Sequence, residues 1–308
     1  MLSRRHIRVK VLQALYSYYN DENVSVAQLE KQLIQNIDRL YELYIYLLLF
    51  LEEMGNYMIH YDEEVKGRYI VDDSDLQAGK KLFNNAILQK LMNSEELHKT
   101  AEKLKVVFKA DRDLLRKIFL DLKNQDAYRD FMNSSGGINV AEQEVILFIL
   151  KNYSGNSPIF EQHLEEEYFN WNDDKKIAVQ MAQKTVQLLA AGKEQEILLP
   201  VGQNPDELYD YARQLLNKTI QENDKLQGII TPKIPKWEPN QVALIDLIIL
   251  KMGVCEFLHF MSIPATVTIN EYIELAKIYS TPQSKKFVNG VLDAIRKDLQ
   301  KEGVLPKN

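Results

Sequence analysis

The stretch 267–292 reads VTINEYIELAKIYSTPQSKKFVNGVL and decides the fold of this chain. Its first part places apolar residues at the three- and four-residue spacing of an amphipathic helix. Its second part gathers polar, basic and aromatic side chains around a short loop and the start of another helix. We therefore expect helices over 269–279 and 282–301, with Asn270 and Glu271 stabilising the beginning of the first.

The rest of the 308-residue chain has the same helical character. Glycine (12) and proline (9) are scarce, while 45% of the residues are hydrophobic and 27% are charged. That balance is typical of a globular protein with a sizeable core, and the length exceeds the usual range of one domain. No stretch alternates apolar and polar residues as a half-buried strand does. The sequence predicts an all-α protein with two domains or one large helical body.

Apolar spacing and capping residues place several further helices. Ser3 is predicted to cap the first helix of the chain. A long amphipathic helix is expected over 25–59, followed by a charged loop over 62–75. Asp206 is predicted to cap a helix that continues to about residue 230.

The N-terminal run SRRHIRVK is basic. Arg4, Arg5, Arg8 and Lys10 have no acidic neighbour in the chain before Asp21. Arginine offers paired N–H donors that match phosphate oxygens, and neutralising phosphates releases counterions. From the charges alone, a solvated basic helix face is the favoured interpretation, and RNA binding is the alternative.

The overall composition limits the classes of function. The net charge of −6 argues against attraction of nucleic acid to the whole surface, but it allows a local basic patch. Cys255 is the single cysteine, and its apolar neighbours favour a core position in a protein of the reducing cytosol. The longest apolar run, 44–51, is far shorter than the roughly 20 residues of a membrane span. We expect a soluble, cytoplasmic protein.

Three segments of the chain resemble the family of the transcription antitermination factor NusB. The C-terminal segment matches the family pattern V-x-I-N-E-x-I-E-L-A-K, followed after a short gap by S-x-K-F-V-N-G-V-L. The N-terminal segment is similar to the family's arginine-rich turn and V-Q-A-L-Y-like helix. The middle segment resembles a D-x-L-Y helix that leads through a loop with proline and tryptophan. The matching residues of the N-terminal segment are Leu12, Gln13, Ala14, Leu15 and Tyr16. Those of the middle segment are Asp206, Leu208, Tyr209, Pro232, Trp237 and Glu256.

The resemblance implies a NusB-like helical bundle of two packed subdomains. Residues 1–22 would supply its first helix and residues 200–304 the remainder. Residues 23–199 have no counterpart in short NusB proteins, so we expect them to form a helical insertion whose end lies between 170 and 199.

The resemblance also implies a function. A NusB-like protein would be an RNA-binding antitermination factor of ribosomal RNA operons. It would bind boxA-type leader RNA together with NusE, a small-subunit ribosomal protein, within an antitermination complex on RNA polymerase. Asp246 falls where the family contacts its protein partner, and Gln283 stands where relatives often carry an acidic residue. The residues expected to contact RNA are Arg4, Arg5, Arg8, Lys10, Tyr16, Gln283, Ser284, Lys286 and Phe287.

Two of these residues have a second interpretation. Aromatic side chains stack on the bases of single-stranded RNA, for roughly 1–3 kcal/mol per base. Phe287 precedes Val291 by four residues on one helix face, so core packing is the alternative to stacking. Tyr16 is likewise either a core aromatic residue or an RNA contact beside the basic turn.

No motif for catalysis or cofactor binding is present in the sequence. The chain lacks the G-x-x-x-x-G-K, G-x-G-x-x-G and G-x-S-x-G patterns, and with them the cofactor segment expected of a NusB-like domain fused to an RNA methyltransferase. His163, Glu166 and Glu167 have metal-ligand spacing, but a solvated charged face is favoured because no second histidine is near. We predict no enzyme activity, no cofactor and no metal. The alternative to RNA binding is a helical protein–protein scaffold that retains the NusB-like fold.

Overall fold

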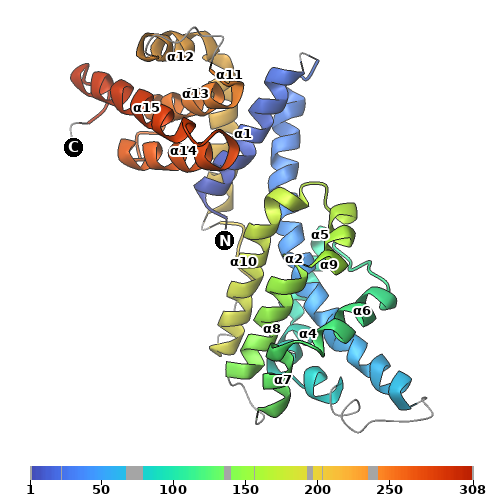
Figure 1. Cartoon of the computed structure of the whole chain (residues 1–308). Coiled ribbons are helices and arrows are strands. Elements are labelled where there is room, and N and C mark those ends of the chain that lie inside the picture. The colour runs from blue at the N-terminus through green and yellow to red at the C-terminus, as the bar shows by residue number, and fades with distance from the viewer. Residues whose placement is uncertain are drawn as a thin grey trace. The chain divides into compact units, whose positions relative to one another are not determined.

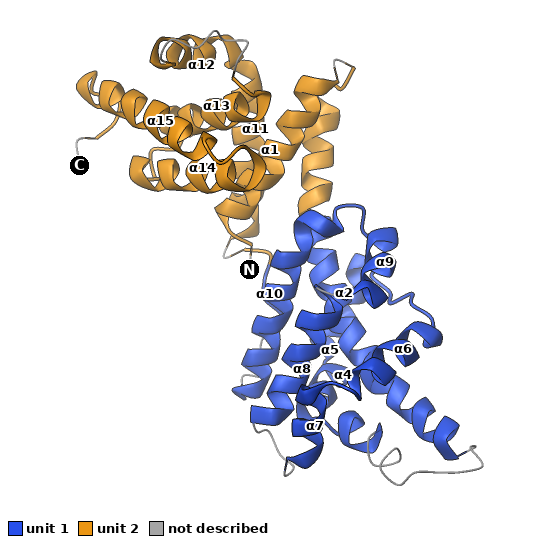
Figure 2. Cartoon of the chain, in the orientation of Figure 1, with its two compact units in different colours: residues 1, 38–200 blue, residues 2–37, 201–308 orange. Residues whose placement is uncertain are grey.

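The structure is a computed structural model that describes residues 2–21, 23–66, 79–134, 140–155, 157–192, 197–202, 204–234 and 242–306. These residues form helices and no strand, which confirms the predicted all-α class (Figure 1). None of the described helices is long and apolar enough to cross a membrane. The chain separates into two compact units, distinguished by colour in Figure 2: unit 1 comprises residues 38–200, and unit 2 comprises residues 2–37 and 201–308.

Unit 2 is built around α13 (Leu244–His259). Residues 248–257 of this helix are all buried, as expected of a helix surrounded by other helices. Gly253 allows a close approach of the last helix, because a Cβ atom there would lie 2.9 Å from Leu292 Cδ2. The helices packed on α13 are α1 (Arg4–Asn20), α11 (Pro205–Gln221), α12 (Asn223–Ile230), α14 (Ala265–Tyr279) and α15 (Ser284–Lys301). A 3₁₀ turn over Thr231–Lys233 follows α12.

Unit 1 is organised on α2 (Val26–Lys66), whose residues 26–37 belong to unit 2. Its core is rich in aromatic rings. Phe50 of α2 stacks on Phe160 with 4.4 Å between ring centroids, and Phe108 packs against both rings. Further helices of unit 1 are α4 (Ala86–Met92), α5 (Glu95–Leu104), α6 (Arg112–Leu122), α7 (Asp126–Asn133), α8 (Val140–Tyr153), α9 (Pro158–Glu167) and α10 (Trp171–Ala190).

The long helix α2 extends beyond its predicted end. It continues to Lys66, because Tyr61 and Val65 are buried and prolong its apolar stripe. The prediction of a loop is therefore wrong for residues 62–66. The remainder of that predicted loop falls on residues 67–75, outside the described residues.

Three predicted helix boundaries also differ from the structure. Asn204, rather than Asp206, caps α11, since its side chain accepts the Glu207 N–H at 3.3 Å. The helix predicted to run to about residue 230 is interrupted at Glu222, where α11 gives way to α12. The helix predicted from residue 269 begins at Ala265 as α14, so Asn270 and Glu271 lie inside it.

Candidate nucleic-acid interface

Arg8 and Glu256 form the polar centre of unit 2. Arg8 shares one stripe of α1 with the buried residues Val11 and Leu15, so its side chain enters the core. Its Nε and Nη2 atoms donate to the two carboxylate oxygens of Glu256, at 2.9 and 2.7 Å. The Arg8 side chain is 3% exposed and the Glu256 side chain 0%. This charge pair therefore joins α1 to α13 within the interior.

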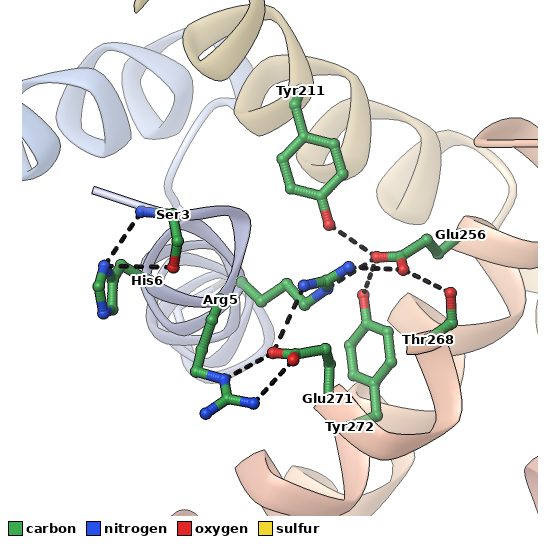
Figure 3. A network of polar contacts seen from close by, with 9 residues as sticks. Ser3, Arg5, His6, Tyr211, Glu256, Thr268, Glu271 and Tyr272 are labelled. Carbon is green, nitrogen blue, oxygen red and sulfur yellow. Dashed lines mark hydrogen bonds and ion pairs between the residues drawn. The ribbon is translucent and has the colours of Figure 1, made fainter. Parts of the chain in front are cut away.

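Three uncharged side chains complete the surroundings of Glu256. Tyr211 of α11 and Thr268 of α14 each donate a hydroxyl hydrogen bond at 2.6 Å, and Tyr272 donates one at 3.1 Å (Figure 3). The Arg8 guanidinium also lies 5.7 Å from the ring centroids of Tyr211 and Tyr272. A buried ion pair persists only when further hydrogen bonds satisfy its remaining atoms, and this network supplies them.

Burial fixes the protonation states in this network. Burial and the charge of Glu256 raise the pKa of Tyr211 and of Tyr272 well above the ordinary value, so both phenols keep the protons they donate. Burial is the largest single influence on the pKa of Arg8 and lowers it, but the hydrogen bonds to Glu256 together with the charges of Tyr272, Tyr211 and Glu256 make the net shift upward. At neutral pH the network is fully formed, and it fixes the position of α1 against three other helices.

Arg4 and Arg5 stand at the outer end of α1. Arg5 makes a two-pronged ion pair with Glu271 of α14 at 2.8 and 2.7 Å (Figure 3), and these hydrogen bonds lower the pKa of Glu271. Arg4 donates from Nη2 to Glu207 Oε1 at 2.7 Å. The exposed fraction of the side chain is 40% for Arg4 and 54% for Arg5. Both arginines are thus oriented by a carboxylate and still face solvent.

A hollow of about 490 Å³ opens beside these arginines. It is lined by residues 3–6 and Arg8 of the chain's start, by Glu271 and by the segment that leads into α14. Burial, together with the charge of Arg5, lowers the pKa of His6 to about 4. The His6 ring is therefore neutral at pH 7, and its Nδ1 accepts the Ser3 N–H at 3.1 Å (Figure 3). The positive charge of this hollow comes from its arginines.

A second hollow, of about 470 Å³ and more apolar, lies among α1, α13 and α14. Tyr16 lines it and is 47% exposed, so the ring is not a core residue. Tyr16 follows Arg4 by twelve residues, or about 18 Å along the helix. The two hollows therefore lie at different ends of α1. The remaining lining residues are Leu12, Gln13, Ala243, Leu244, Ile245 and Tyr279.

Asp246 and Ser284 are both buried, and they join the first turn of α13 to the first turn of α15. Ser284 Oγ donates to Asp246 Oδ2 at 2.7 Å. Since its proton is used in that bond, Ser284 Oγ accepts the hydroxyl groups of Ser280 and Thr281, each at 2.9 Å. This network fixes the loop between α14 and α15 next to the second hollow.

The predicted RNA-contacting residues therefore divide into two groups. Gln283 and Lys286 are exposed at the start of α15, together with Lys285, and Phe287 is half-buried. Lys10 is 3% exposed and lies in the interior, as Arg8 and Ser284 do. The exposed group consists of Arg4, Arg5, Tyr16, Gln283 and Lys286.

Sequence reasoning missed the partners of the arginines. Glu256 lies in the apolar run of α13, and a carboxylate in such a helix requires a cationic or hydrogen-bonding partner. Arg8 precedes the apolar residues Val11, Leu12 and Leu15 at helical spacing, which marks it as an inward-facing cation. Both signals were present in the sequence, but the pairing spans 248 positions and no local pattern reveals it.

The predicted solvated face at His163 is wrong. The His163 ring stacks on Phe160 with 5.5 Å between centroids, and its Nε2 lies 2.5 Å from the Tyr46 hydroxyl. Burial lowers the pKa of His163. In the part of the chain that the structure describes, no group of three or more His, Cys, Asp or Glu residues is arranged to hold a metal ion.

Cys255 lies where its apolar neighbours predicted. It is buried, with an exposed fraction of 0%, in the central helix α13. Burial raises the pKa of its thiol to about 12, so the group stays protonated and acts as a small apolar residue.

Comparison with known proteins gives one family. Residues 172–297 match the model of the NusB family, from α10 to near the end of α15. The transcription antitermination protein NusB of Salinibacter ruber is 39% identical over 111 residues, which cover 36% of this chain and 69% of that protein. The NusB proteins of Chloroherpeton thalassium and Bacillus pumilus are 38% and 35% identical, over 47% and 70% of their lengths and 32% and 30% of this chain. No solved structure matches significantly. With a relative this similar over more than two thirds of its length, the chain belongs to the NusB family.

Proposed function

We propose that this protein is a transcription antitermination factor that binds boxA-type leader RNA of ribosomal RNA operons together with a NusE-type ribosomal protein. Membership of a family whose relatives are named antitermination proteins supports the general role. The observation that carries the RNA-binding part is the exposed set of arginine and tyrosine side chains along α1. In this proposal the complex forms on RNA polymerase, and the protein catalyses no reaction.

The charge distribution supports unit 2 as the RNA-binding part. Residues 38–200 contain 28 Asp and Glu against 20 Lys and Arg, a net charge of −8, whereas the remaining residues contain 16 against 18, a net charge of +2. Phosphate attraction favours the less acidic unit. Within it, Arg4 and Arg5 offer exposed N–H donors, and Tyr16 offers an exposed ring for base stacking.

Arg8 has a different role in this proposal. Because its guanidinium is buried against Glu256, a phosphate contact would first require that ion pair to break. We assign Arg8 to positioning: it fixes the outer turn of α1, from which Arg4 and Arg5 project. Loss of Arg8 would therefore weaken RNA binding by releasing that turn.

The test is fluorescence anisotropy with a labelled boxA-like single-stranded RNA and a scrambled RNA, over a salt series, with and without the NusE-type protein. Wild type should prefer the boxA-like RNA, and more strongly with the partner. A variant with Arg4, Arg5 and Lys286 changed to alanine should lose affinity, and its log–log salt slope should flatten by roughly 2 for three lost phosphate contacts. Binding that is absent even with the partner, or unchanged in the variant, would refute the proposal.

Two matched controls sharpen this experiment. Lys297 is 61% exposed on the same helix as Lys286, so Lys297→Ala removes a surface charge outside the proposed interface and should leave the slope unchanged. Arg5→Ala also removes the two-pronged partner of Glu271, which keeps only its longer ion pair to Arg8 and could then repel RNA. Glu271→Gln alone should therefore keep the affinity for RNA. This control separates the effect of losing the Arg5 donor from the effect of releasing the Glu271 carboxylate.

We further propose that the NusE-type partner binds at the first turn of α13. Asp246 is buried there beside residues 243–245, which line the second hollow. Asp246→Ala would remove the acceptor of Ser284 and disturb that surface. The variant should reduce the gain in RNA affinity that the partner provides by a larger factor than it reduces RNA binding measured without the partner.

A helical protein–protein scaffold is the second candidate function. Its support is the pairing of Arg4, Arg5 and Arg8 with carboxylates of the same chain, which lowers the positive charge available to RNA. This candidate expects partner binding that is independent of RNA and of the Arg4 and Arg5 side chains. The anisotropy series distinguishes the two functions directly.

A further inference from the structure

Phe169 is an exposed aromatic residue on a firmly held corner of unit 1. The corner joins α9 to α10, and the Phe169 side chain is 90% exposed. Its neighbour Tyr168 packs edge-on against Tyr46, with 5.3 Å between ring centroids, and Trp171 is 1% exposed. The Tyr168 N–H donates to Leu164 O at 2.9 Å, and the Trp171 N–H donates to Tyr168 O at 2.8 Å. The chain on both sides of Phe169 is therefore anchored while its ring faces solvent.

A second exposed apolar side chain lies on the same platform. Val107 is 65% exposed and precedes Phe108, whose ring packs on Tyr46 with 5.2 Å between centroids. Lys109 forms an ion pair with Glu167 at 2.5 Å, and its N–H donates to the Tyr46 hydroxyl at 3.4 Å. The Val107 segment and the end of α9 are thus joined around Tyr46. Val107 and Phe169 are thus two exposed apolar side chains whose chain neighbours both pack on Tyr46.

The platform carries one paired carboxylate, Glu167 with Lys109, and two further carboxylates at its edge. Glu165 and Glu166 are exposed; Glu165 accepts the Asn172 side-chain amide at 2.9 Å and Glu166 that of Gln162 at 3.0 Å. No ion pair links either carboxylate to a lysine or arginine of the described residues. With a net charge of −8 over residues 38–200, the corner repels a polyanion and attracts a cation.

We infer that this corner, defined by Glu165, Glu166, Phe169 and Val107, docks a basic protein surface that carries an apolar pocket for the Phe169 ring. Aromatic anchors at the centre of an interface contribute most of the binding energy, and preorganised ones lose little entropy on binding. Surrounding carboxylates steer a basic partner and set the orientation of the complex. The inference concerns unit 1 and does not depend on RNA binding by unit 2.

The test uses a random-peptide library displayed on phage and selected on the full-length protein, followed by anisotropy with the enriched peptides. The expected winners combine lysine or arginine with leucine, methionine or phenylalanine. Phe169→Ser should weaken their binding by more than about tenfold. A Glu165→Gln/Glu166→Gln variant should weaken it less and flatten its salt dependence.

Val140→Ser is the matched control, because Val140 is 70% exposed in the same unit but belongs to α8. It should leave peptide binding unchanged, and all variants should bind boxA-like RNA as wild type does. The inference is overturned if no enriched peptide depends on Phe169, or if the enriched peptides lack basic residues. Sedimentation velocity could instead show a dimer that Phe169→Ser abolishes. That result would assign the corner to a second copy of this chain and would overturn the inference of a basic partner.

Discussion

The two units of this protein stabilise their interiors by different means. Unit 2 holds its helices around a buried ion pair, in which Glu256 receives hydrogen bonds from four side chains. Unit 1 holds α2 against α9 through stacked rings, with Phe50, Phe160 and His163 at the centre. A buried ion pair specifies one arrangement of the helices around it, but removing its charges from water costs free energy. Packed aromatic rings are stabilised by the area that they bury, and they tolerate small shifts in position.

The difference matches what each unit does in the proposals above. In unit 2 the buried Arg8 determines the position of the turn that exposes Arg4 and Arg5, so a precise interior supports a precise basic surface. In unit 1 the ring cluster supplies a rigid platform, and residues 38–200 carry a net charge of −8. One interior thus serves a proposed RNA surface and the other a proposed protein surface.

The largest effect that tests this comparison is expected for Glu256→Ala. It leaves the buried Arg8 guanidinium with only its longer ion pair to Glu271, at 3.6 Å, which should lower the free energy of unfolding of unit 2 by roughly 3–5 kcal/mol. Hydrogen exchange of α1 and α13 amides should accelerate while that of α8 and α10 is unchanged. The double variant Arg8→Met/Glu256→Leu should recover most of the loss. Equal destabilisation in the double variant would mean that the ion pair itself, rather than an unpaired charge, decides the stability.

The matching change in unit 1 is Phe160→Ala. Its ring is fully buried between Phe50 and Phe108, so the cavity should cost about 3 kcal/mol. The loss should appear in urea unfolding monitored by the fluorescence of the buried Trp171, with α13 amides still protected. Unprotected α13 amides in this variant would show that the units do not unfold independently.

A smaller effect is expected when a single hydroxyl is removed from the ring cluster. Tyr46→Phe keeps the ring but loses its contact with His163 and its acceptance of the Lys109 N–H. Neutral hydrogen bonds contribute about 1 kcal/mol net, far less than the centre of unit 2 should lose. Tyr41→Phe, on the same helix, is the control, and its unfolding midpoint in urea should stay closer to wild type.

The smallest effects are expected for variants that change the response of each unit to acid. The pKa of Glu271 is lowered in the folded protein, so its contribution is complete above the ordinary value near 4.3 and is lost as the pH falls through the lower folded value. Because Arg5 is half exposed, solvent limits this to less than about 1 kcal/mol. Glu271→Gln should remove that part of the acid sensitivity of unit 2, measured as urea unfolding midpoints from pH 6 to pH 3.

At higher pH a histidine acts in each unit: His6 in unit 2, whose pKa is lowered to about 4, and His163 in unit 1. The pKa of His163 is also lowered, so the unfolded chain takes up its proton first, and stability declines as the pH falls below about 6.5. His163→Gln should flatten this earlier decline. A single acid transition shared by both units, unaffected by either variant, would contradict the separation of their interiors.

The sequence was sufficient for the helices and for the exposed half of the candidate site. Helical spacing alone predicts α1 and most of α2, because both the pattern and the structure are local. Exposure of Arg4, Arg5, Gln283 and Lys286 agrees with the expectation of a solvent-facing basic surface. Their contact with RNA stays a prediction.

The rest of the site depends on contacts between distant segments. The depth of Arg8 is set by Glu256, and that of Ser284 by Asp246, 38 positions away. Charge and spacing give the chemistry of a side chain and the helix face on which it lies, but its burial depends on which other helix packs against that face. That is why Lys10 and Ser284 look like surface residues in the sequence and lie inside the folded unit, and why the partner of Arg8 is not evident from its position in α1.

The division of the chain has a consequence for the order of synthesis. On the ribosome α1 emerges before its partners on α11 and α13, which follow only after residues 38–200 have been made. Domains fold as units during synthesis, so unit 1 can complete its core while α1 still lacks most of its own. Until Glu256 emerges, Arg8 stays hydrated in the nascent chain. Translation speed through 38–200 thus sets the time for which the apolar stripe of α1 is available to chaperones.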